Sequence, residues 1–175
     1  MEKETQIYHW KRFDLIERDM VLPNDKKITH TLVKHPGASV IIPIDAKGNL
    51  VMLKQFRPAI NSWIIEFAAG TIEEGEDHQA CAIRELAEEC GLAAKKWQYI
   101  GDTIVTPGFC DERLHCYLCS DLMPAVGEMD EDEVIETFAM SPQEFEQAVV
   151  SQEIIDSKTI TSYFKAKLAL DTQRE

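Results

Sequence analysis

The apolar positions of the chain follow a strand spacing over most of its length. Short β-favouring runs fill residues 6–35, where Pro23-Asn24-Asp25 forms a turn and His35-Pro36-Gly37 ends the segment. Two continuous apolar runs then flank a turn at 45–49, a pattern that predicts a β-hairpin. The strands predicted outside residues 6–35 are 39–44, 50–56, about 98–105, 114–120 and 134–140.

Helical spacing appears in the remaining segments. Residues 77–90 have apolar side chains at i, i+3, i+6, i+7 and i+10, with Asp77 as a plausible N-cap and Gly91 as a stop. Ser141-Pro142-Gln143-Glu144 starts another helix with a capping box, and a last amphipathic helix spans 158–170. Strands mixed with a few helices indicate an α/β layer architecture. The apolar faces expected for the first and last helices are Ala80, Ile83, Leu86, Ala87 and Cys90, and Ile160, Tyr163, Phe164 and Leu168.

No internal repeat, low-complexity tract or long linker divides the chain. We therefore expect a main domain in residues 38–175 preceded by an N-terminal appendage of strands in residues 1–37. No stretch approaches ~18 consecutive apolar residues, so no membrane span is predicted. The first residues lack an apolar signal core, and the cysteines number five, an odd count typical of reduced thiols. We expect a cytoplasmic protein.

Charge is strongly and unevenly acidic. The chain of 175 residues has 31 acidic and 18 basic residues, a net charge of −13. Residues 1–35 carry seven basic and six acidic side chains, a net +1, which leaves −14 for the rest. This balance argues against binding to a nucleic-acid backbone, which needs clustered Lys and Arg. The acidity is either a solvated surface or a gathering of carboxylates that hold divalent cations.

The most informative stretch is residues 70–92. Glu85, Glu88 and Glu89 stand at i, i+3 and i+4, on one face of the predicted helix, and Arg84 can pair with Glu88. Such a pattern on an arbitrary helix is usually a solvated acidic face. Here the acidic face follows a glycine-containing loop and the other face is apolar, so we expect a helix docked on a core. Fixed carboxylate oxygens suit Mg²⁺ or Mn²⁺.

At these residues the chain resembles the Nudix hydrolases, whose pattern is G-x5-E-x7-R-E-U-x-E-E-x-G-U, with U a bulky aliphatic residue. The family hydrolyses a nucleoside diphosphate linked to another moiety, using divalent cations on the helix glutamates. The resemblance implies an α+β fold (an α/β/α sandwich), with a mixed β-sheet between helices. The fixed positions are filled by Gly70, Glu76, Arg84, Glu85, Leu86, Glu88, Glu89, Gly91 and Leu92.

The resemblance also implies a role for each polar position of the motif. Glu85 and Glu89 are the principal metal ligands, and Glu88 is a further ligand or helper. Arg84 orients the glutamates, and Glu76 is structural. The reaction implied is water attack at phosphorus, in which metals activate the water and neutralise charge on the phosphate oxygens.

Flanking residues resemble the ADP-ribose and nucleoside-diphosphate-sugar pyrophosphatases, over roughly residues 10–170. The matching segments are 54–58, 66–70, 106–109 and 130–133. In the acidic run 130–133, Glu133 completes the metal site and Glu131 is a candidate general base; the alternative is a solvated loop. The other implied residues are Arg57 on the diphosphate, Glu66 in the substrate site, the Ala69 carbonyl on the metal, Pro107 in a substrate loop and Glu112 facing the ribose.

Aromatic residues near the N-terminus allow two interpretations. Trp10, Phe13 and Trp63 are core residues in the commoner case. The subfamily, however, dimerises through its N-terminal strands and stacks the base on aromatics there, which implies a homodimer with Trp10 or Phe13 as a base platform. Subfamily members often carry arginine where this chain has Thr29-His30-Thr31, so a strict preference for ADP-ribose is not implied.

The leading hypothesis is therefore a Mg²⁺-dependent diphosphatase, with Mn²⁺ as a possible substitute. It splits ADP-ribose or related nucleoside diphosphate sugars into a nucleoside monophosphate and a sugar phosphate, and needs no nucleic acid or membrane. One alternative is a Nudix nucleoside triphosphate pyrophosphatase, which tends to lack the N-terminal strands and the acidic run. The other is a non-catalytic Nudix-like nucleotide sensor, which predicts lost glutamates.

Overall fold

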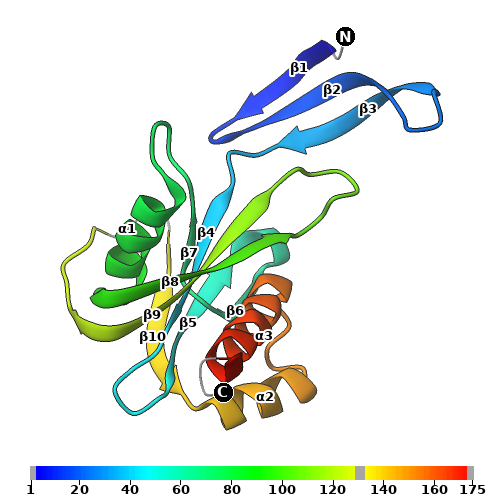
Figure 1. Ribbon diagram of the computed structural model, residues 1–175. Helices are drawn as coiled ribbons and strands as arrows, with labels where there is room; N and C mark the ends of the chain where they lie inside the picture. The colour runs from blue at the N-terminus through cyan, green and yellow to red at the C-terminus, as the bar shows by residue number, and fades with distance from the viewer. Residues whose placement is uncertain (1–2, 129–132, 173–175) are drawn as a thin grey trace.

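The computed structural model describes residues 3–128 and 133–172 (Figure 1). The strands are β1 (Lys3–Trp10), β2 (Phe13–Val21), β3 (Lys27–Lys34), β4 (Ala38–Pro43), β5 (Leu50–Arg57), β6 (Ser62–Glu66), β7 (Ala69–Thr71), β8 (Leu92–Ile104), β9 (Arg113–Pro124) and β10 (Ile135–Met140). The helices are α1 (His78–Cys90), α2 (Pro142–Val150) and α3 (Ser157–Thr172), with a short 3₁₀ turn at Pro58–Ile60.

The first three strands form an antiparallel sheet that stands apart from the body, as Figure 1 shows. This confirms the strands predicted in residues 6–35. Every residue of β1 is exposed. The sheet contacts the body through the loop between β8 and β9, where the Val33 N–H donates to the Phe109 carbonyl at 2.7 Å.

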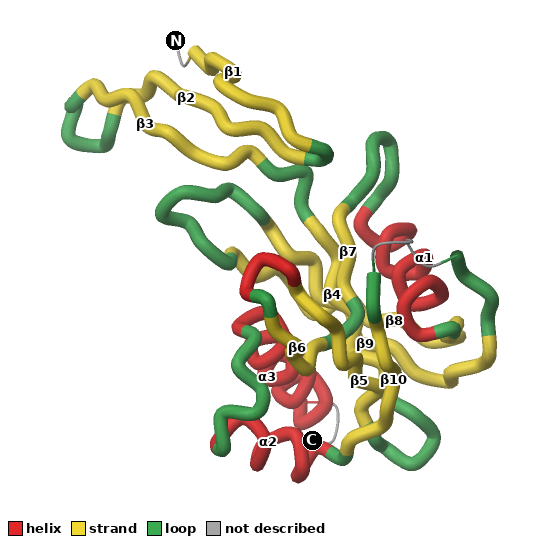
Figure 2. Tube along the Cα trace, turned by 180° about the vertical axis from the view of Figure 1, so that it is seen from behind, coloured by secondary structure: helices red, strands yellow, loops and turns green. Residues whose placement is uncertain are grey.

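The body consists of two sheets between helices. The first, in the order β7-β4-β9-β8, is mixed because β4 and β9 run parallel; the second, β10-β5-β6, is antiparallel. Figures 1 and 2 show α1 on one side of the sheets and α3 with α2 on the other. Successive side chains of β4 face opposite ways: Val40 and Ile42 join the cluster of α2 and α3, and Ile41 joins that of α1. The predicted α+β sandwich is confirmed.

The predicted hairpin of residues 39–56 is wrong. Strands β4 and β5 belong to different sheets, and a single bridge, Ile44 to Leu50, joins them. All six residues of β4 are buried. Because β4 lies between β7 and β9 with both faces covered, tertiary packing and not the turn at 45–49 selects its partners. Strands β6 and β7 were not predicted, and β8 begins at Leu92 rather than near residue 98.

The predicted ends of helix α1 are confirmed. The Asp77 side chain accepts hydrogen bonds from the N–H groups of Gln79 and Ala80, at 2.8 and 2.9 Å. Gly91 ends the helix with φ of 64°, a left-handed conformation that glycine adopts without strain. The capping box of Ser141 and Glu144 on α2 is also present.

The predicted apolar faces of two helices are confirmed only in part, because Leu86 of α1 and Tyr163 of α3 are buried but other predicted residues are not. In α1, Ala80 and Ile83 are exposed. In α3, Phe164 and Leu168 are exposed, whereas Tyr163 is buried and Ile160 packs against the core. The residues actually buried are Cys81, Ala82, Glu85, Leu86 and Glu89 of α1, and Thr159, Ser162, Tyr163 and Ala166 of α3. In the described part of the chain, no helix has the length and apolar character that crossing a membrane requires.

Candidate active site: an acidic cleft beside helix α1

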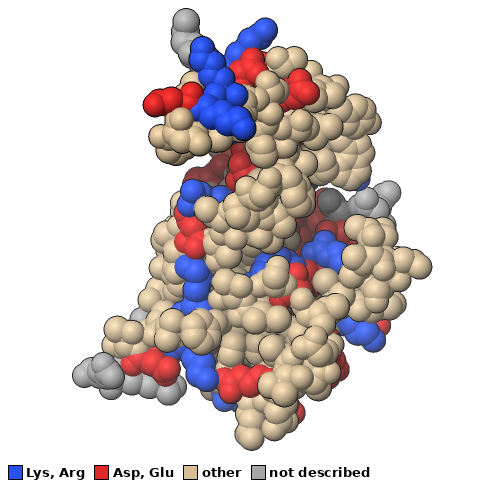
Figure 3. Space-filling model, turned by 90° about the vertical axis from the view of Figure 1, so that its right-hand side faces the viewer, with Lys and Arg blue, Asp and Glu red and all other residues tan. Residues whose placement is uncertain are grey.

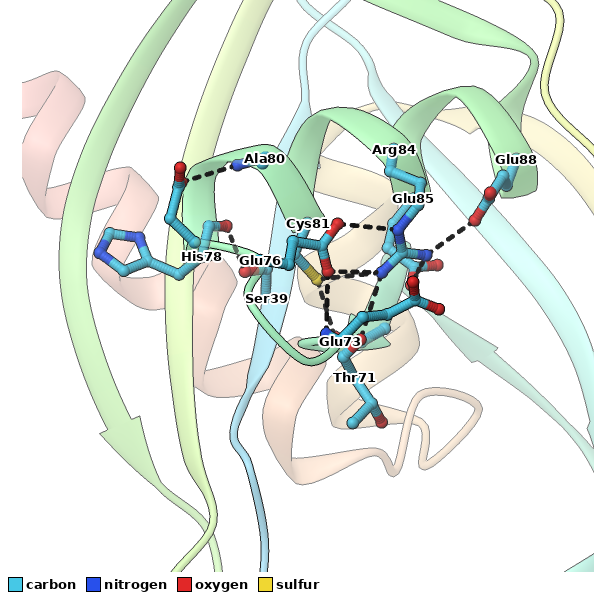
Figure 4. A network of polar contacts seen from close by, with 12 residues as sticks. Ser39, Thr71, Glu73, Glu76, His78, Ala80, Cys81, Arg84, Glu85 and Glu88 are labelled. Carbon is cyan, nitrogen blue, oxygen red and sulfur yellow. Dashed lines mark hydrogen bonds and ion pairs between the residues drawn. The ribbon is translucent and has the colours of Figure 1, made fainter. Parts of the chain in front are cut away.

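Arg84 is the centre of the polar network on helix α1 (Figure 4). Its Nε and Nη2 donate to the two carboxylate oxygens of Glu76, at 2.9 and 3.0 Å. Its Nη1 donates to Glu85 at 2.6 Å and to Glu88 at 2.9 Å. A further bond, from Nη2 to the Thr71 carbonyl at 3.2 Å, ties the group to β7. One planar guanidinium thus fixes the loop before the helix and two helix carboxylates at once.

Glu76 lies on the loop between β7 and α1 and serves this anchor. Besides the two bonds from Arg84, its Oε2 accepts from the Glu73 N–H at 3.0 Å. The hydrogen bonds from Arg84 lower the pKa of Glu76. They raise the pKa of Arg84 in turn, so both groups are charged at neutral pH.

Glu85 and Glu89 are carboxylates on the buried side of α1, with 7% and 3% of their surface exposed. Glu89 Oε2 accepts from the Ala69 N–H at 2.8 Å. Burial raises the pKa of Glu85 to about 7 and that of Glu89 to about 9, and the charges of neighbouring carboxylates, Glu133 among them, add to both shifts. Buried oxygens that repel one another in this way are suited to a divalent cation, whose charge removes the cost of ionising them.

Gly70 makes room for this arrangement. A Cβ atom at position 70 would lie 1.6 Å from Oε1 of Glu85, which no side-chain adjustment short of moving the carboxylate can relieve. The glycine of the motif therefore lets the Glu85 carboxylate lie directly on the backbone of β7.

The residues around Arg84 line one side of a cleft of about 180 Å³. Strand β7, the end of β5, helix α1 and the turn between β1 and β2 surround it. Of the predicted site residues, the structure brings six together in the lining, and Glu89 adjoins them through Ala69. The lining consists of Arg12, Arg57, Ala69, Gly70, Thr71, Glu73, Arg84, Glu85, Glu88 and Glu133.

Arg57 and Glu66 form a close ion pair at this cleft. Arg57 Nε and Nη2 donate to the two oxygens of Glu66 at 2.7 and 2.9 Å. The Glu66 side chain has no exposed surface, whereas that of Arg57 is 36% exposed. Of the two residues, only Arg57 lines the cleft. Glu66 is buried behind it and fixes the Arg57 guanidinium through these two hydrogen bonds.

Other predicted substrate residues lie away from the acidic cleft. Pro107 lines a second cavity, of about 540 Å³, between the N-terminal sheet and the loop after β8. Glu112 on that loop is 3.7 Å from His35. Glu131 lies outside the described residues.

The aromatic side chains near the N-terminus are not core residues. Trp10 and Trp63 are 47% and 41% exposed, so the interpretation of these two as core side chains is wrong. Trp10 contacts Phe13, with ring centroids 4.9 Å apart, on either side of the turn between β1 and β2.

Arg12, like Thr71 and Glu73, is a cleft residue that sequence reasoning missed. It lies in that turn, and its Nη2 donates to Glu73 Oε1 at 3.2 Å. The position of an arginine between two aromatic residues was visible in the sequence, but its proximity to residue 73 was not, because it depends on how the N-terminal sheet is placed.

Known proteins are similar to this chain in sequence and in fold. The sequence profile of the NUDIX domain matches residues 33–159. The chain is 38% identical to an ADP-ribose pyrophosphatase of Bacillus subtilis, over 98% of this chain and 95% of the relative. It is 34% identical to a methanol dehydrogenase activator of Bacillus methanolicus, over 90% and 86%. A solved structure described as an ADP compounds hydrolase has the same fold, with a TM-score of 0.83, 19% identity and coverage of 98% and 93%.

The chain therefore belongs to the Nudix family and is a Nudix hydrolase. The motif of residues 70–92, which lines the cleft, falls within the matched domain.

Proposed function

We propose that this Nudix hydrolase is a diphosphatase that hydrolyses ADP-ribose or a related nucleoside diphosphate sugar to a nucleoside monophosphate and a sugar phosphate. The observation that carries the proposal is the cleft in which the carboxylates of α1 lie beside Arg57. Carboxylates alone repel an anionic substrate, whereas carboxylates that hold cations, next to an arginine, bind one. Similarity to the Bacillus subtilis ADP-ribose pyrophosphatase supports this substrate class.

The cofactor in this proposal is Mg²⁺, with Mn²⁺ as a substitute. Glu85, Glu89, Glu133 and the Ala69 carbonyl hold it, a set of hard oxygen donors of the kind that these ions prefer. The raised pKa values of Glu85 and Glu89 support this assignment, since they arise from burial and crowding that a cation relieves. When bound, such ions lower the pKa of a water molecule and neutralise charge that develops on phosphate oxygens.

The side chains of the cleft supply the rest of the reaction. The oxygen of water forms a bond to phosphorus as the bond from phosphorus to the bridging oxygen breaks, and the water proton passes to a general base, Glu131 or Glu133. Arg57 binds the diphosphate through its planar guanidinium. Arg84 does not take part in proton transfer; it orients Glu85 and Glu88, as its hydrogen bonds at 2.6 and 2.9 Å support.

Base and sugar are recognised in a homodimer in this proposal. The N-terminal sheet exposes Ile7, Tyr8 and Trp10 by 47 to 61%, an apolar surface that a second subunit can cover. Trp10 or Phe13 then stacks on the base, Pro107 lies in the substrate loop, and Glu112 on the same loop faces the ribose. In the view of Figure 3, basic side chains on this sheet stand beside acidic ones, and the two are mixed over the body as well, so we propose neither nucleic acid nor membrane as a partner.

A substrate panel tests the proposal. ADP-ribose, GDP-mannose and several nucleoside triphosphates are incubated with the protein in Mg²⁺ and in EDTA, and the products are separated by chromatography. The proposal predicts AMP and ribose 5-phosphate from ADP-ribose in Mg²⁺, and none in EDTA. Pyrophosphate release from triphosphates alone would identify the triphosphate pyrophosphatase instead. Binding without hydrolysis of any compound would identify the nucleotide sensor.

A further inference from the structure

A row of paired charged side chains connects the end of strand β5, at the cleft, with the start of helix α3. The buried Glu66 carboxylate accepts hydrogen bonds from Arg57 through both oxygens, and its Oε2 also accepts from Lys158 Nζ. Lys158 donates to Asp156 as well, at 2.9 Å. Glu66 and Lys158 are 92 residues apart in the sequence, so only the packing of α3 against β6 brings them together.

A second contact fixes α3 at the same place. The Phe67 N–H donates to Thr159 Oγ1 at 3.0 Å, and both residues have no exposed surface. The Thr159 N–H donates to Asp156 at 3.0 Å. These hydrogen bonds hold the first turn of α3 in place, and Lys158 reaches Glu66 from this turn. The Lys158 ammonium is itself held between Glu66 and Asp156.

The charges of this row of residues are balanced. Arg57 and Lys158 are the cations, and Glu66 and Asp156 are the carboxylates. If Lys158 were neutral, Arg57 would be the one positive charge left in this group for the carboxylates of Glu66 and Asp156. A buried carboxylate whose charge is not compensated is costly. Because Glu89 also attracts Arg57, the guanidinium would no longer have one defined position.

The position of Arg57 matters because its guanidinium keeps a hydrogen-bond donor that Glu66 does not use. Nε and Nη2 are directed at Glu66, and within residues 3–128 and 133–172 Nη1 makes no hydrogen bond. The side chain is 36% exposed and lines the cleft. The pair with Glu66 thus fixes the plane of the guanidinium and leaves one nitrogen for a ligand.

We propose that Lys158 is a positioning residue: it neutralises and fixes Glu66, so that Glu66 holds the Arg57 guanidinium where it binds the substrate diphosphate. This inference rests on the proposed function, which gives Arg57 that role. Lys158 is 15% exposed and is not part of the cleft lining, so it acts through Arg57 and does not touch the substrate.

Steady-state kinetics on ADP-ribose in Mg²⁺ test the proposal with Lys158→Met, which keeps the length of the side chain and removes its charge. We expect KM to rise about 5- to 50-fold with kcat nearly unchanged, because a contact to the diphosphate is present in both ground and transition state. Lys158→Arg restores most of the loss. A purely structural role would instead lower the active fraction, and so reduce kcat at constant KM.

Lys165→Met is the matched control. Lys165 is a half-buried lysine on the same helix, and its Nζ donates to the Ile100 carbonyl at 3.4 Å, away from Glu66. This variant should keep the wild-type KM. Lys158→Gln replaces Lys158→Met if the latter does not fold, as judged by circular dichroism.

A double-mutant cycle decides whether Lys158 acts through Arg57. In the Arg57→Ala background, Lys158→Met should add no further rise in KM. The same factor with and without Arg57, or an unchanged KM in an active protein, overturns this inference alone. A wild type that cleaves neither ADP-ribose nor GDP-mannose, and does not bind α,β-methylene-ADP-ribose in calorimetry, overturns the proposed function, and this inference with it.

Discussion

Glu85 and Glu89 lie on the side of α1 that faces the protein, where apolar residues are expected from helical spacing. Their identity as functional residues came from the motif, because a run of fixed positions over residues 70–92 is specific. Their burial could not be predicted, since polar side chains do not mark the inner face of a helix. The cost of burying them appears in their pKa values, raised to about 7 and about 9.

These two pKa values predict how the stability of the metal-free protein depends on pH. Their folded-state values lie above the ordinary 4.5, so between pH 4.5 and 9 the folded state binds more protons than the unfolded state. The stability that protonation provides is complete below about pH 4.5 and is lost as pH rises through 7 and 9. We expect the free energy of unfolding in urea and EDTA to fall from pH 5 to pH 9.

Glu89→Gln isolates the effect from that of other titrating groups. In this variant the free energy of unfolding should fall less steeply from pH 5 to pH 9, because glutamine does not ionise. Saturating Mg²⁺ should stabilise the wild type more at pH 9 than at pH 5. An equal slope in wild type and Glu89→Gln would show that Glu89 is an ordinary carboxylate.

At the scale of the elements, the parts of the fold that could be predicted are those with local causes. The caps of α1 at Asp77 and Gly91, and the capping box of α2, depend on side chains within a few residues. The partners of β4 could not be predicted, because β7 and β9 reach it from distant parts of the chain. The same holds for Lys158 and Glu66, whose contact depends on the docking of α3.

The end of strand β5 carries a prediction about specificity. Arg57 is the last residue of β5, and Glu66 holds its guanidinium at the cleft. Since every nucleoside diphosphate sugar has a diphosphate, Arg57→Ala should lower kcat/KM for ADP-ribose and GDP-mannose alike. The expected factor is about 10–100, which corresponds to ~1.4–2.8 kcal/mol.

Kinetics on both substrates, for wild type and variant, measure this effect. With Thr29-His30-Thr31 in place of an arginine, we expect the wild type to accept both within about tenfold. Loss of one activity with the other spared would mean that Arg57 recognises the sugar or the base.

At the scale of the whole molecule, the described residues of the acidic cleft lie together, but the residues proposed to recognise the base and the sugar are spread. Trp10 and Phe13 lie on the N-terminal sheet, and Pro107 and Glu112 lie on the loop after β8. A sequence can identify these residues through a family resemblance. It cannot show which of them meet, because that depends on how the N-terminal sheet is placed against the body.

Assembly is therefore a separate prediction. Strand β1 is exposed along its whole length, and no helix covers its sheet in the described residues. We expect a two-fold homodimer at micromolar concentration, measured by light scattering. Fully active protein with the mass of one chain, 19.9 kDa, would rule the dimer out.

The most direct measurement of the central claim is the turnover of ADP-ribose by Glu85→Gln and Glu89→Gln at saturating Mg²⁺. Each change removes one negative charge at nearly constant shape from the cleft of α1, so the folds should be retained, as circular dichroism can verify. We predict that the release of AMP and ribose 5-phosphate slows by about 10³ or more in each variant. Turnover at the wild-type rate in both variants would mean that the carboxylates of α1 do not hold the catalytic cation.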